Sequence, residues 1–368
     1  MVHIKYLFKY DYESEGYKTA IKAYERGGVS SVIWSITNEC NLRCIFCYMK
    51  AGSKLEDELT TSEALQLIDE LVELGKPLLF ITGGEPLLRS DIFEILKYAS
   101  DNGLRIILST NGSLITRDVA SSLARIGVHY IALPFYGDRV LHEYYTRVYG
   151  SFDMVLKAIS KLKERGLRVG FKVIALKPVF KVFDKIMEYA DRLKIDLIYI
   201  CDLIPFGYGV NLINEALDVG SWRNLLDMII ESIILSDRYG FDIDIGAHPS
   251  SAIYILERLK SLDYDVSKAL NKMSRRKLCP VGRGFIAISS NGNILPCNFL
   301  PIYSIGNIRN YRLRDLIKSP DLTSLGDSNK LNGYCLKCKY RDICGGCRVK
   351  AYLSNGDIYS SDPTCIIR

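Results

Sequence analysis

The residues of this sequence that could do chemistry are first of all its cysteines, three of which lie on one short segment. Cys40, Cys44 and Cys47 are spaced x3 and x2, directly after a β-branched run that predicts a strand. Three thiolates on one loop can hold three irons of a cubane cluster and leave the fourth iron open for a ligand. A zinc knuckle would need a fourth Cys or His nearby, and none occurs between residues 48 and 128. The spacing therefore favours an iron-sulfur cluster.

A second group of cysteines fills the end of the chain. Its members are Cys279, Cys297, Cys335, Cys338, Cys344, Cys347 and Cys365. Many turn residues and few strand-like runs accompany them, which predicts a small domain held together by metal rather than by a large core. A zinc ribbon is the alternative, because Cys335, Cys338, Cys344 and Cys347 alone could bind one zinc. The remaining cysteine, Cys201, is interpreted as a buried apolar residue.

Elements that would position the first cysteine loop follow from the periodicity. Short apolar runs alternate with amphipathic stretches. The predicted strands are 31–37, 78–82, 105–110, 129–133, 168–175 and 196–201, and the predicted helices are 61–74, 91–100, 118–125, 152–165 and 183–193. Six such units predict an α/β fold, a partial (β/α)6 TIM-like barrel with a wide mouth. The cysteine loop would lie at the carboxyl ends of the strands, where reactive sites of such sheets lie.

The remaining segments complete the predicted domain organisation. Residues 1–30 are an N-terminal extension with a strand over 4–10 and a helix over 16–26. The barrel spans 31–205, a helical connection with helices over 219–239 and 251–270 spans 206–275, and a small C-terminal cysteine-rich iron-sulfur domain spans 276–368, with a short strand over 285–289.

Composition limits the classes of function. The 368 residues are 48% hydrophobic and carry a formal charge of +6. Apolar runs are far shorter than the roughly 18 residues of a membrane span, and no secretory signal is visible, so a cytoplasmic protein without a membrane span is expected. Without a long basic run, nucleic acid is not an expected partner. The mild positive charge suits an anionic small substrate.

The first cysteine loop resembles that of the radical S-adenosylmethionine superfamily, in which an aromatic residue, here Phe46, precedes the last cysteine. Residues after the second and third predicted strands are similar to the cofactor motifs of that family. The resemblance implies cofactor contacts by Gly83, Gly84, Glu85 and Pro86 at the methionine amino group and by Ser109 and Asn111 near the ribose. A plain Asn-Gly turn is the alternative for the latter pair.

Two further stretches bear on the cofactor. The segment 142–147 resembles a family stretch whose arginine approaches the cofactor carboxylate, which assigns that role to Arg147, with a solvated surface arginine as the alternative. The segment 133–137 departs from the usual serine-aspartate-glycine stretch, which puts the polar contact expected there in doubt.

The C-terminal cysteines resemble the SPASM-type extension of one branch of the superfamily, which holds auxiliary iron-sulfur clusters. The resemblance implies one 4Fe-4S cluster on Cys335, Cys338, Cys344 and Cys365. It implies a second on Cys279, Cys297 and Cys347, with an open or non-cysteine fourth site. The x2 spacing between Cys344 and Cys347, where x3 is common, leaves a single auxiliary cluster as the alternative.

The segments 32–37, 247–249, 254–256, 344–348 and 362–365 look most like those of the branch that acts on haem-type tetrapyrroles, in alternative haem and haem d1 biosynthesis, and the resemblance runs over nearly the whole chain. That resemblance implies radical removal of a carboxyl-bearing group from an anionic iron tetrapyrrole, by decarboxylation or acetate loss. A low-potential donor such as ferredoxin or flavodoxin would reduce the cluster. His248 is a candidate axial ligand of the substrate iron, with a simply hydrogen-bonded histidine as the alternative.

Two other functions stay open. A maturase that modifies a peptide or protein side chain shares both cysteine clusters and differs mainly in a peptide-docking module before the barrel. Only about thirty residues precede the first predicted strand, which is short for such a module. The other alternative is a non-catalytic iron-sulfur or zinc-binding protein, which would not cleave S-adenosylmethionine.

Overall fold

The computed structural model describes residues 2–8 and 15–368. Its strands are β1 (Val2–His3), β2 (Ser31–Ser35), β3 (Leu78–Thr82), β4 (Ile106–Ser109), β5 (Tyr130–Pro134), β6 (Val169–Ala175), β7 (Leu197–Asp202), β8 (Asp242–Gly246), β9 (Phe285–Ile288), β10 (Asn293–Leu295) and β11 (Gly306–Asn307).

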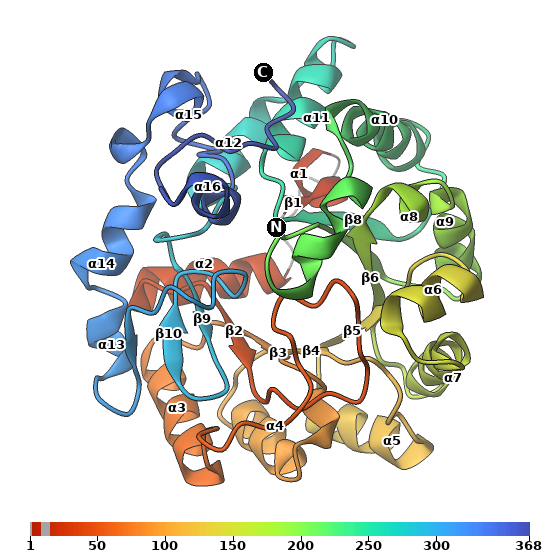
Figure 1. Ribbon diagram of the computed structural model, residues 1–368, viewed down its shortest axis with the longest axis vertical. Helices are drawn as coiled ribbons and strands as arrows, with labels where there is room; N and C mark the ends of the chain where they lie inside the picture. The colour runs from red at the N-terminus through yellow and green to blue at the C-terminus, as the bar shows by residue number, and fades with distance from the viewer. Residues whose placement is uncertain (1, 9–14) are drawn as a thin grey trace.

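The α-helices cover the outer side of these strands (Figure 1). They are α1 (Ile4–Phe8), α2 (Glu15–Gly27), α3 (Thr61–Glu73), α4 (Ile92–Asp101), α5 (Arg117–Ile126), α6 (Arg139–Thr146), α7 (Ser151–Lys163), α8 (Lys177–Phe180), α9 (Phe183–Arg192), α10 (Val219–Ile229), α11 (Ser250–Lys260), α12 (Ser267–Arg276), α13 (Leu313–Leu316), α14 (Pro320–Thr323), α15 (Gly333–Lys337) and α16 (Arg348–Asn355). Short helical turns include η2 (Gly207–Glu215) and a π-helical turn, η3 (Ile230–Leu235), that extends α10.

One sheet runs through the whole molecule. Its strand order within the described residues is β1-β8-β7-β6-β5-β4-β3-β2-β9-β10-β11. Each neighbouring pair from β2 to β8 is parallel, and β9 joins β2 in parallel on the other side. The strands are buried almost throughout, as in parallel sheets with both faces covered. The predicted partial barrel is confirmed.

The sheet extends further than the sequence predicted. Strand β8 lies in the segment 206–275, which was expected to be purely helical, and adds a parallel strand to β7. The predicted helix 251–270 is two helices, α11 and α12. At the N-terminal end, residues 4–8 form α1 rather than the predicted strand, while residues 9 and 10 lie outside the described residues. The short strand β1 pairs antiparallel with β8 instead.

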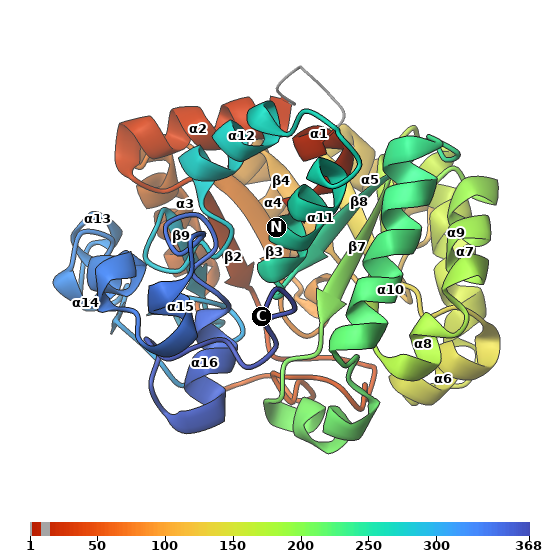
Figure 2. The same cartoon turned by 90° about the horizontal axis from the view of Figure 1, so that it is seen from above.

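The C-terminal cysteine-rich segment packs beside the β2 edge of the barrel (blue in Figures 1 and 2). Because β9 continues the barrel sheet, this segment starts as part of the barrel layer. A small second hydrophobic cluster joins this segment, including Cys279 and Cys347, to Ile204 of the segment that follows β7. No helix within the described residues is long and apolar enough to cross a membrane.

Candidate active site

The first cysteine loop leaves β2 at its carboxyl end and is tied to the helix pair beyond β5. The N–H of Arg43 donates to the carbonyl of Thr146 at 3.1 Å, and that of Ile45 donates to Tyr145 at 3.0 Å. The Phe46 ring packs edge-on against Tyr136 at 5.2 Å. The three thiols are half-buried, and burial, followed by the neighbouring thiols, raises the pKa of Cys44. The structure thus brings Cys40, Cys44 and Cys47 together on one loop.

A buried carboxylate fixes the start of this loop. Glu58 Oε1 accepts from Thr37 Oγ1 at 3.1 Å and from the Asn38 N–H at 2.6 Å. Arg89 supports the same corner, because its guanidinium donates to the carbonyls of Ile36 and Leu59 and pairs with Asp91. These long-range contacts position the cysteine loop, and local sequence patterns gave no signal for them.

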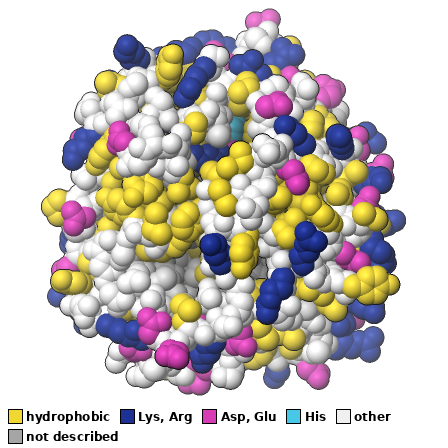
Figure 3. All heavy atoms as spheres, in the orientation of Figure 1, with side chains coloured by type: hydrophobic (Ala, Val, Ile, Leu, Met, Phe, Trp, Pro, Cys, Tyr) yellow, Lys and Arg dark blue, Asp and Glu magenta, His cyan; other side chains and the backbone are white. Residues whose placement is uncertain are grey.

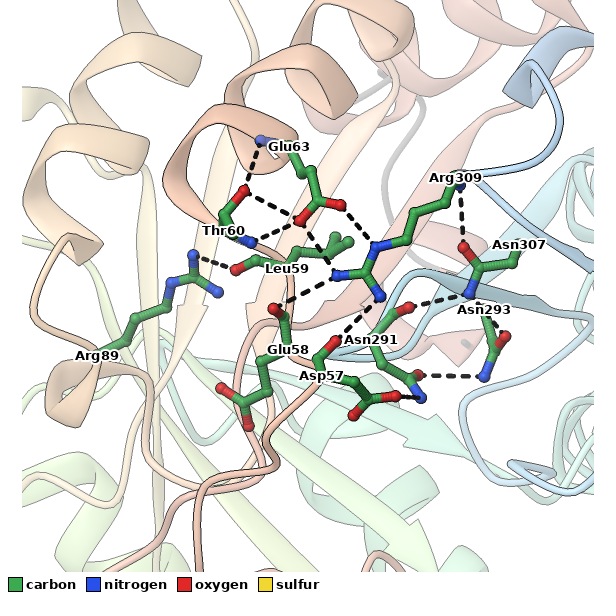
Figure 4. Close-up of polar contacts among 10 residues, drawn as sticks. All are labelled: Asp57, Glu58, Leu59, Thr60, Glu63, Arg89, Asn291, Asn293, Asn307 and Arg309. Carbon is green, nitrogen blue, oxygen red and sulfur yellow. Dashed lines mark hydrogen bonds and ion pairs between the residues drawn. The ribbon is translucent and has the colours of Figure 1, made fainter.

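A second arginine joins this corner to the C-terminal segment (Figure 4). Arg309, which follows β11, donates to both carboxylate oxygens of Glu63 at 2.6 and 3.1 Å and to the carbonyl of Asp57 at 3.1 Å. Glu63 closes the capping box of Thr60 that begins α3. The Arg309 bonds hold the pKa of Glu63 at about 2. The loop after the first cysteines is therefore clamped between the barrel and the C-terminal segment.

The glycine-rich turn after β3 packs directly on the backbone of the cysteine loop. A Cβ on Gly83 would lie 2.4 Å from the Thr37 carbonyl oxygen, and one on Gly84 would lie 2.1 Å from that of Glu39. Gly84 and Glu85 donate their N–H groups to these two carbonyls at 2.8 and 2.7 Å. Only glycine permits this approach, so the two glycines set the distance between the turn and the cysteines.

Glu85 is fully buried, and its carboxylate joins β3 to β4. It accepts from Thr110 Oγ1 at 2.6 Å, the Asn111 N–H at 2.6 Å and the Leu87 N–H at 3.1 Å. Burial raises its pKa, while these hydrogen bonds act in the opposite direction. Glu85 thus orders the strand ends at the mouth, and the adjoining Pro86 begins a buried helical turn.

The end of β4 provides polar groups at the same mouth, as predicted for Ser109 and Asn111. Asn111 Nδ2 donates to Asn41 Oδ1 at 2.8 Å, which links it to the residue after Cys40. Ser109 Oγ accepts from Lys172 Nζ at 2.8 Å, a partner that sequence reasoning missed. The one signal for Lys172 was a lysine inside the otherwise apolar run of β6.

Arg147 and His248 were proposed as a cofactor contact and as a ligand of the substrate iron, and the structure places them in very different surroundings. Arg147 is exposed, and its guanidinium stacks on the exposed Tyr144 ring at 4.9 Å. His248 is buried and stacked on Trp222, with Nε2 donating to the Thr364 carbonyl at 3.1 Å and Nδ1 bonded to Ser251 Oγ at 2.6 Å. Burial lowers its pKa to about 4, so it is neutral. Iron coordination by either nitrogen would require one of these bonds to break.

The C-terminal cysteines do not all share one environment. The thiol of Cys344 has Cys335 and Cys365 among its electrostatic neighbours. N–H groups point at these sulfurs: Asp362 to Cys335 at 3.5 Å, Gly346 to Cys344 at 3.5 Å and Tyr340 to Cys338 at 3.4 Å. Such donors suit thiolates that ligate an iron-sulfur cluster. The donor set therefore fits the cluster predicted for Cys335, Cys338, Cys344 and Cys365.

Cys347 belongs to a different hydrophobic cluster from Cys344. It is buried in the same hydrophobic cluster as Cys279, against which Cys297 packs. Its N–H donates to Asp362 Oδ2 at 2.7 Å, so one aspartate spans both groups. This arrangement fits the predicted assignment of Cys347 to the second auxiliary cluster. Within the described part of the chain, no three His, Cys, Asp or Glu side chains are arranged to hold a single metal ion.

The cysteine regions of the barrel and of the C-terminal segment meet at Tyr48. Its hydroxyl accepts from Asn298 Nδ2 at 3.2 Å, next to Cys297, and its ring packs edge-on against Phe299 at 5.0 Å. A cavity of about 390 Å³ opens beside it, and its lining includes Ser35, Phe206 and Asn298. On this side of the molecule hydrophobic side chains gather over the middle of the face, with lysine and arginine side chains among them (Figure 3). The lining of the cavity combines apolar side chains with Asn and Ser side chains and one lysine, Lys50.

Cys201, interpreted from the sequence as a buried apolar residue, lies between the two regions. It is the penultimate residue of β7, and burial raises its pKa to about 11; Tyr199 is its hydrogen-bond partner, and Lys172 and Asp202 are its electrostatic neighbours. Cys297 also has Cys201 as a neighbour. Its position inside the barrel was not predicted.

Comparison with known proteins agrees with this geometry. Residues 34–189 match the radical SAM superfamily, and residues 279–339 match an iron-sulfur cluster-binding domain named SPASM. The AdoMet-dependent heme synthase of Methanosarcina barkeri is 30% identical over 92% of this chain and 96% of its own length. The Fe-coproporphyrin III synthase of the same organism is 27% identical over 98% of this chain and 93% of its own.

A solved structure shows the same fold. The crystal structure of Streptococcus suis SuiB bound to precursor peptide SuiA has a TM-score of 0.75 at 19% identity, covering 95% of this chain and 80% of that chain. The first cysteine loop thus lies within the radical SAM match, Cys279, Cys297, Cys335 and Cys338 lie within the SPASM match, and a relative aligns over nearly its full length. The chain belongs to the radical S-adenosylmethionine superfamily, in the branch with a SPASM domain, and is an enzyme whose cofactors are 4Fe-4S clusters and S-adenosylmethionine.

Proposed function

We propose that this enzyme removes a carboxyl-bearing group from an iron tetrapyrrole in haem biosynthesis. The observation that carries the proposal is the similarity, over nearly the whole chain, to relatives named heme synthase and Fe-coproporphyrin III synthase. The cavity beside Tyr48, between the first cysteine loop and the Cys297 segment, supports it. A largely apolar lining that carries Lys50 suits a flat hydrophobic ring with a carboxylate at its edge.

The first cysteine loop, the glycine turn and the barrel would each have a separate role in this reaction. The cluster and S-adenosylmethionine, held by these residues, would supply the chemistry of hydrogen-atom abstraction from a substrate carbon. Cys40, Cys44 and Cys47 would hold the cluster, and the turn at Gly83 and Gly84 would present backbone carbonyls to the methionine amino group. The barrel would exclude water and position the reacting carbon.

The C-terminal module would serve electron transfer or substrate binding. Cys335, Cys338, Cys344 and Cys365 would hold one auxiliary cluster, and Cys279, Cys297 and Cys347 the other. The second group lies nearer the first cysteine loop, because Cys297 adjoins the Asn298 contact to Tyr48. A low-potential cytoplasmic donor such as ferredoxin or flavodoxin would reduce the first cluster.

The test is anaerobic cluster reconstitution, reduction and incubation with S-adenosylmethionine. Formation of 5'-deoxyadenosine is measured by mass spectrometry with iron-coproporphyrin III, with didecarboxysiroheme and without substrate. We expect one tetrapyrrole to stimulate cofactor cleavage and to lose mass by a carboxyl-bearing group. Cleavage that neither tetrapyrrole stimulates, with no change in their masses, would contradict the proposal.

A peptide maturase is the second candidate, favoured by the fold shared with SuiB in its peptide complex. Against it, the described residues before β2 do not form a separate docking module. Strand β1 extends the barrel sheet, and Ile4 and Leu7 of α1 belong to the main hydrophobic core. Radical cofactor cleavage without tetrapyrrole turnover would move this candidate to first place.

A further inference from the structure

We propose that Lys172 binds a ligand carboxylate at the carboxyl end of the barrel, in the role that the family resemblance assigns to Arg147. The inference rests on the proposed function in one respect. The carboxylate comes either from the methionine part of the cofactor or from the tetrapyrrole substrate.

The sheet directs Lys172 to the barrel interior. In β6 it pairs with Pro134 of β5 and Tyr199 of β7. Strand periodicity puts it on the same face as Gly170, two residues earlier. A Cβ on Gly170 would lie 1.5 Å from Tyr130 Oη, so the Tyr130 ring fills the space below Lys172. The ammonium group is therefore held towards the mouth of the barrel.

Titratable groups of the candidate active site surround this ammonium group. Its electrostatic neighbours are Cys201, Cys44, Cys47 and Glu85. It donates a hydrogen bond to Ser109 Oγ at 2.8 Å, and among the described residues it has no carboxylate within the 4.0 Å of an ion pair. Glu85 is already engaged by Thr110, Asn111 and Leu87. An ammonium group has three N–H donors, so after bonding Ser109 the Lys172 side chain can still donate to a ligand.

A comparison with Lys350 shows why this capacity matters. Lys350 is also buried, but it forms an ion pair with Asp202. A partly buried cation without a carboxylate partner is costly unless an anion neutralises it. Arg147, by contrast, stacks on Tyr144 in solvent. Lys172, not Arg147, is therefore the cation placed to receive a carboxylate beside the first cysteine loop.

The test compares Lys172→Met with the wild-type holoenzyme and with the exposed-lysine control Lys181→Met. The probes are S-adenosylmethionine and its decarboxylated analogue. Readouts are equilibrium binding and the change that each probe causes in the EPR spectrum of the reduced cluster. If the carboxylate belongs to the cofactor, Lys172→Met weakens S-adenosylmethionine binding by about tenfold or more, a typical charge-assisted contribution. Binding of the decarboxylated analogue stays unchanged.

A second pair of probes tests the substrate as the source. Iron-coproporphyrin III and its tetramethyl ester are titrated by absorbance. If the carboxylate belongs to the tetrapyrrole, Lys172→Met weakens binding of the acid by about tenfold and leaves the ester unchanged. The binding of S-adenosylmethionine and of its decarboxylated analogue is measured without a tetrapyrrole. This result therefore stands even if the enzyme proves not to act on tetrapyrroles.

Equal weakening of charged and neutral probes, or no weakening, overturns the proposal. Unequal iron content or a shifted cluster potential with equal probe affinities also overturns it, because Lys172 then acts on the cluster alone. Lys172→Gln serves as a second variant if the methionine variant does not fold, and the same pattern is expected from it.

Discussion

The two cysteine regions of this enzyme are held by different means. The first lies on a loop whose position comes from the barrel: Glu58, Arg89 and the glycine turn fix its backbone, while its thiols stay half-buried. In the C-terminal segment, N–H groups point at the sulfurs, and Cys335, Cys344 and Cys347 are buried. A loop whose backbone is held by the barrel can leave one side of its cluster open for a ligand. Thiols enclosed by the protein are better suited to holding a structural or electron-transfer cluster.

The largest effect is expected from removing the three cysteines of the first loop, which should affect cofactor cleavage but not the iron of the C-terminal segment. Cys40, Cys44 and Cys47 changed together to alanine should abolish 5'-deoxyadenosine formation, because the cluster that binds the cofactor loses all three ligands. Iron held by the C-terminal cysteines should remain. Iron analysis and mass spectrometry measure both quantities. The reciprocal control changes Cys335 and Cys338, which should remove iron of the other region. Unchanged cofactor cleavage in the triple variant would refute the assignment.

The next effect concerns the ion pair that joins the regions. Lys350 of α16 pairs with Asp202 at the end of β7, and both are buried. Lys350→Met leaves an unpaired buried carboxylate and should lower the free energy of unfolding by about 3–5 kcal/mol. Chemical denaturation measures it, with the exposed Lys339→Met as control. Removing both charges with Asp202→Asn should recover part of the loss; an additive loss would show that the pair is not coupled.

A smaller effect is expected at the mouth of the barrel. Glu85→Gln replaces an acceptor oxygen by an amide that cannot accept from every donor around it. We expect a loss of about 1–3 kcal/mol in the free energy of unfolding. Cofactor affinity should also fall, because the ends of β3 and β4 lose their shared carboxylate. The exposed Glu94→Gln on α4 is the matched control, and equal stability of the two variants would argue against this role.

The smallest effect lies at the clamp shown in Figure 4. Arg309→Ala removes a partly exposed ion pair with Glu63 and should cost about 1 kcal/mol or less. Since the pKa of Glu63 is held at about 2, the pair is charged at neutral pH. Its contribution is present above the ordinary glutamate pKa and is lost as pH falls towards 2. Thermal unfolding at neutral pH should show a difference that 1 M salt reduces; Arg314→Ala is the control.

Features that depend on residues close together along the chain could be predicted from the sequence. Cysteine spacing indicated the iron-sulfur chemistry, and strand and helix periodicity predicted β2 to β7 with boundaries near those observed. The glycines of the turn after β3 were identified in the sequence as cofactor contacts, and the structure adds their close approach to the cysteine loop. Local order of this kind follows from side-chain periodicity and backbone freedom.

Contacts between residues far apart along the chain could be seen only in the tertiary structure. It adds β8 and β9 to the sheet, turns Arg147 towards solvent, and places Lys172 and Cys201 inside the barrel. It also separates Cys347 from Cys344, although two residues lie between them. These outcomes depend on strand pairing and on burial of charge across more than a hundred residues, which no local pattern encodes.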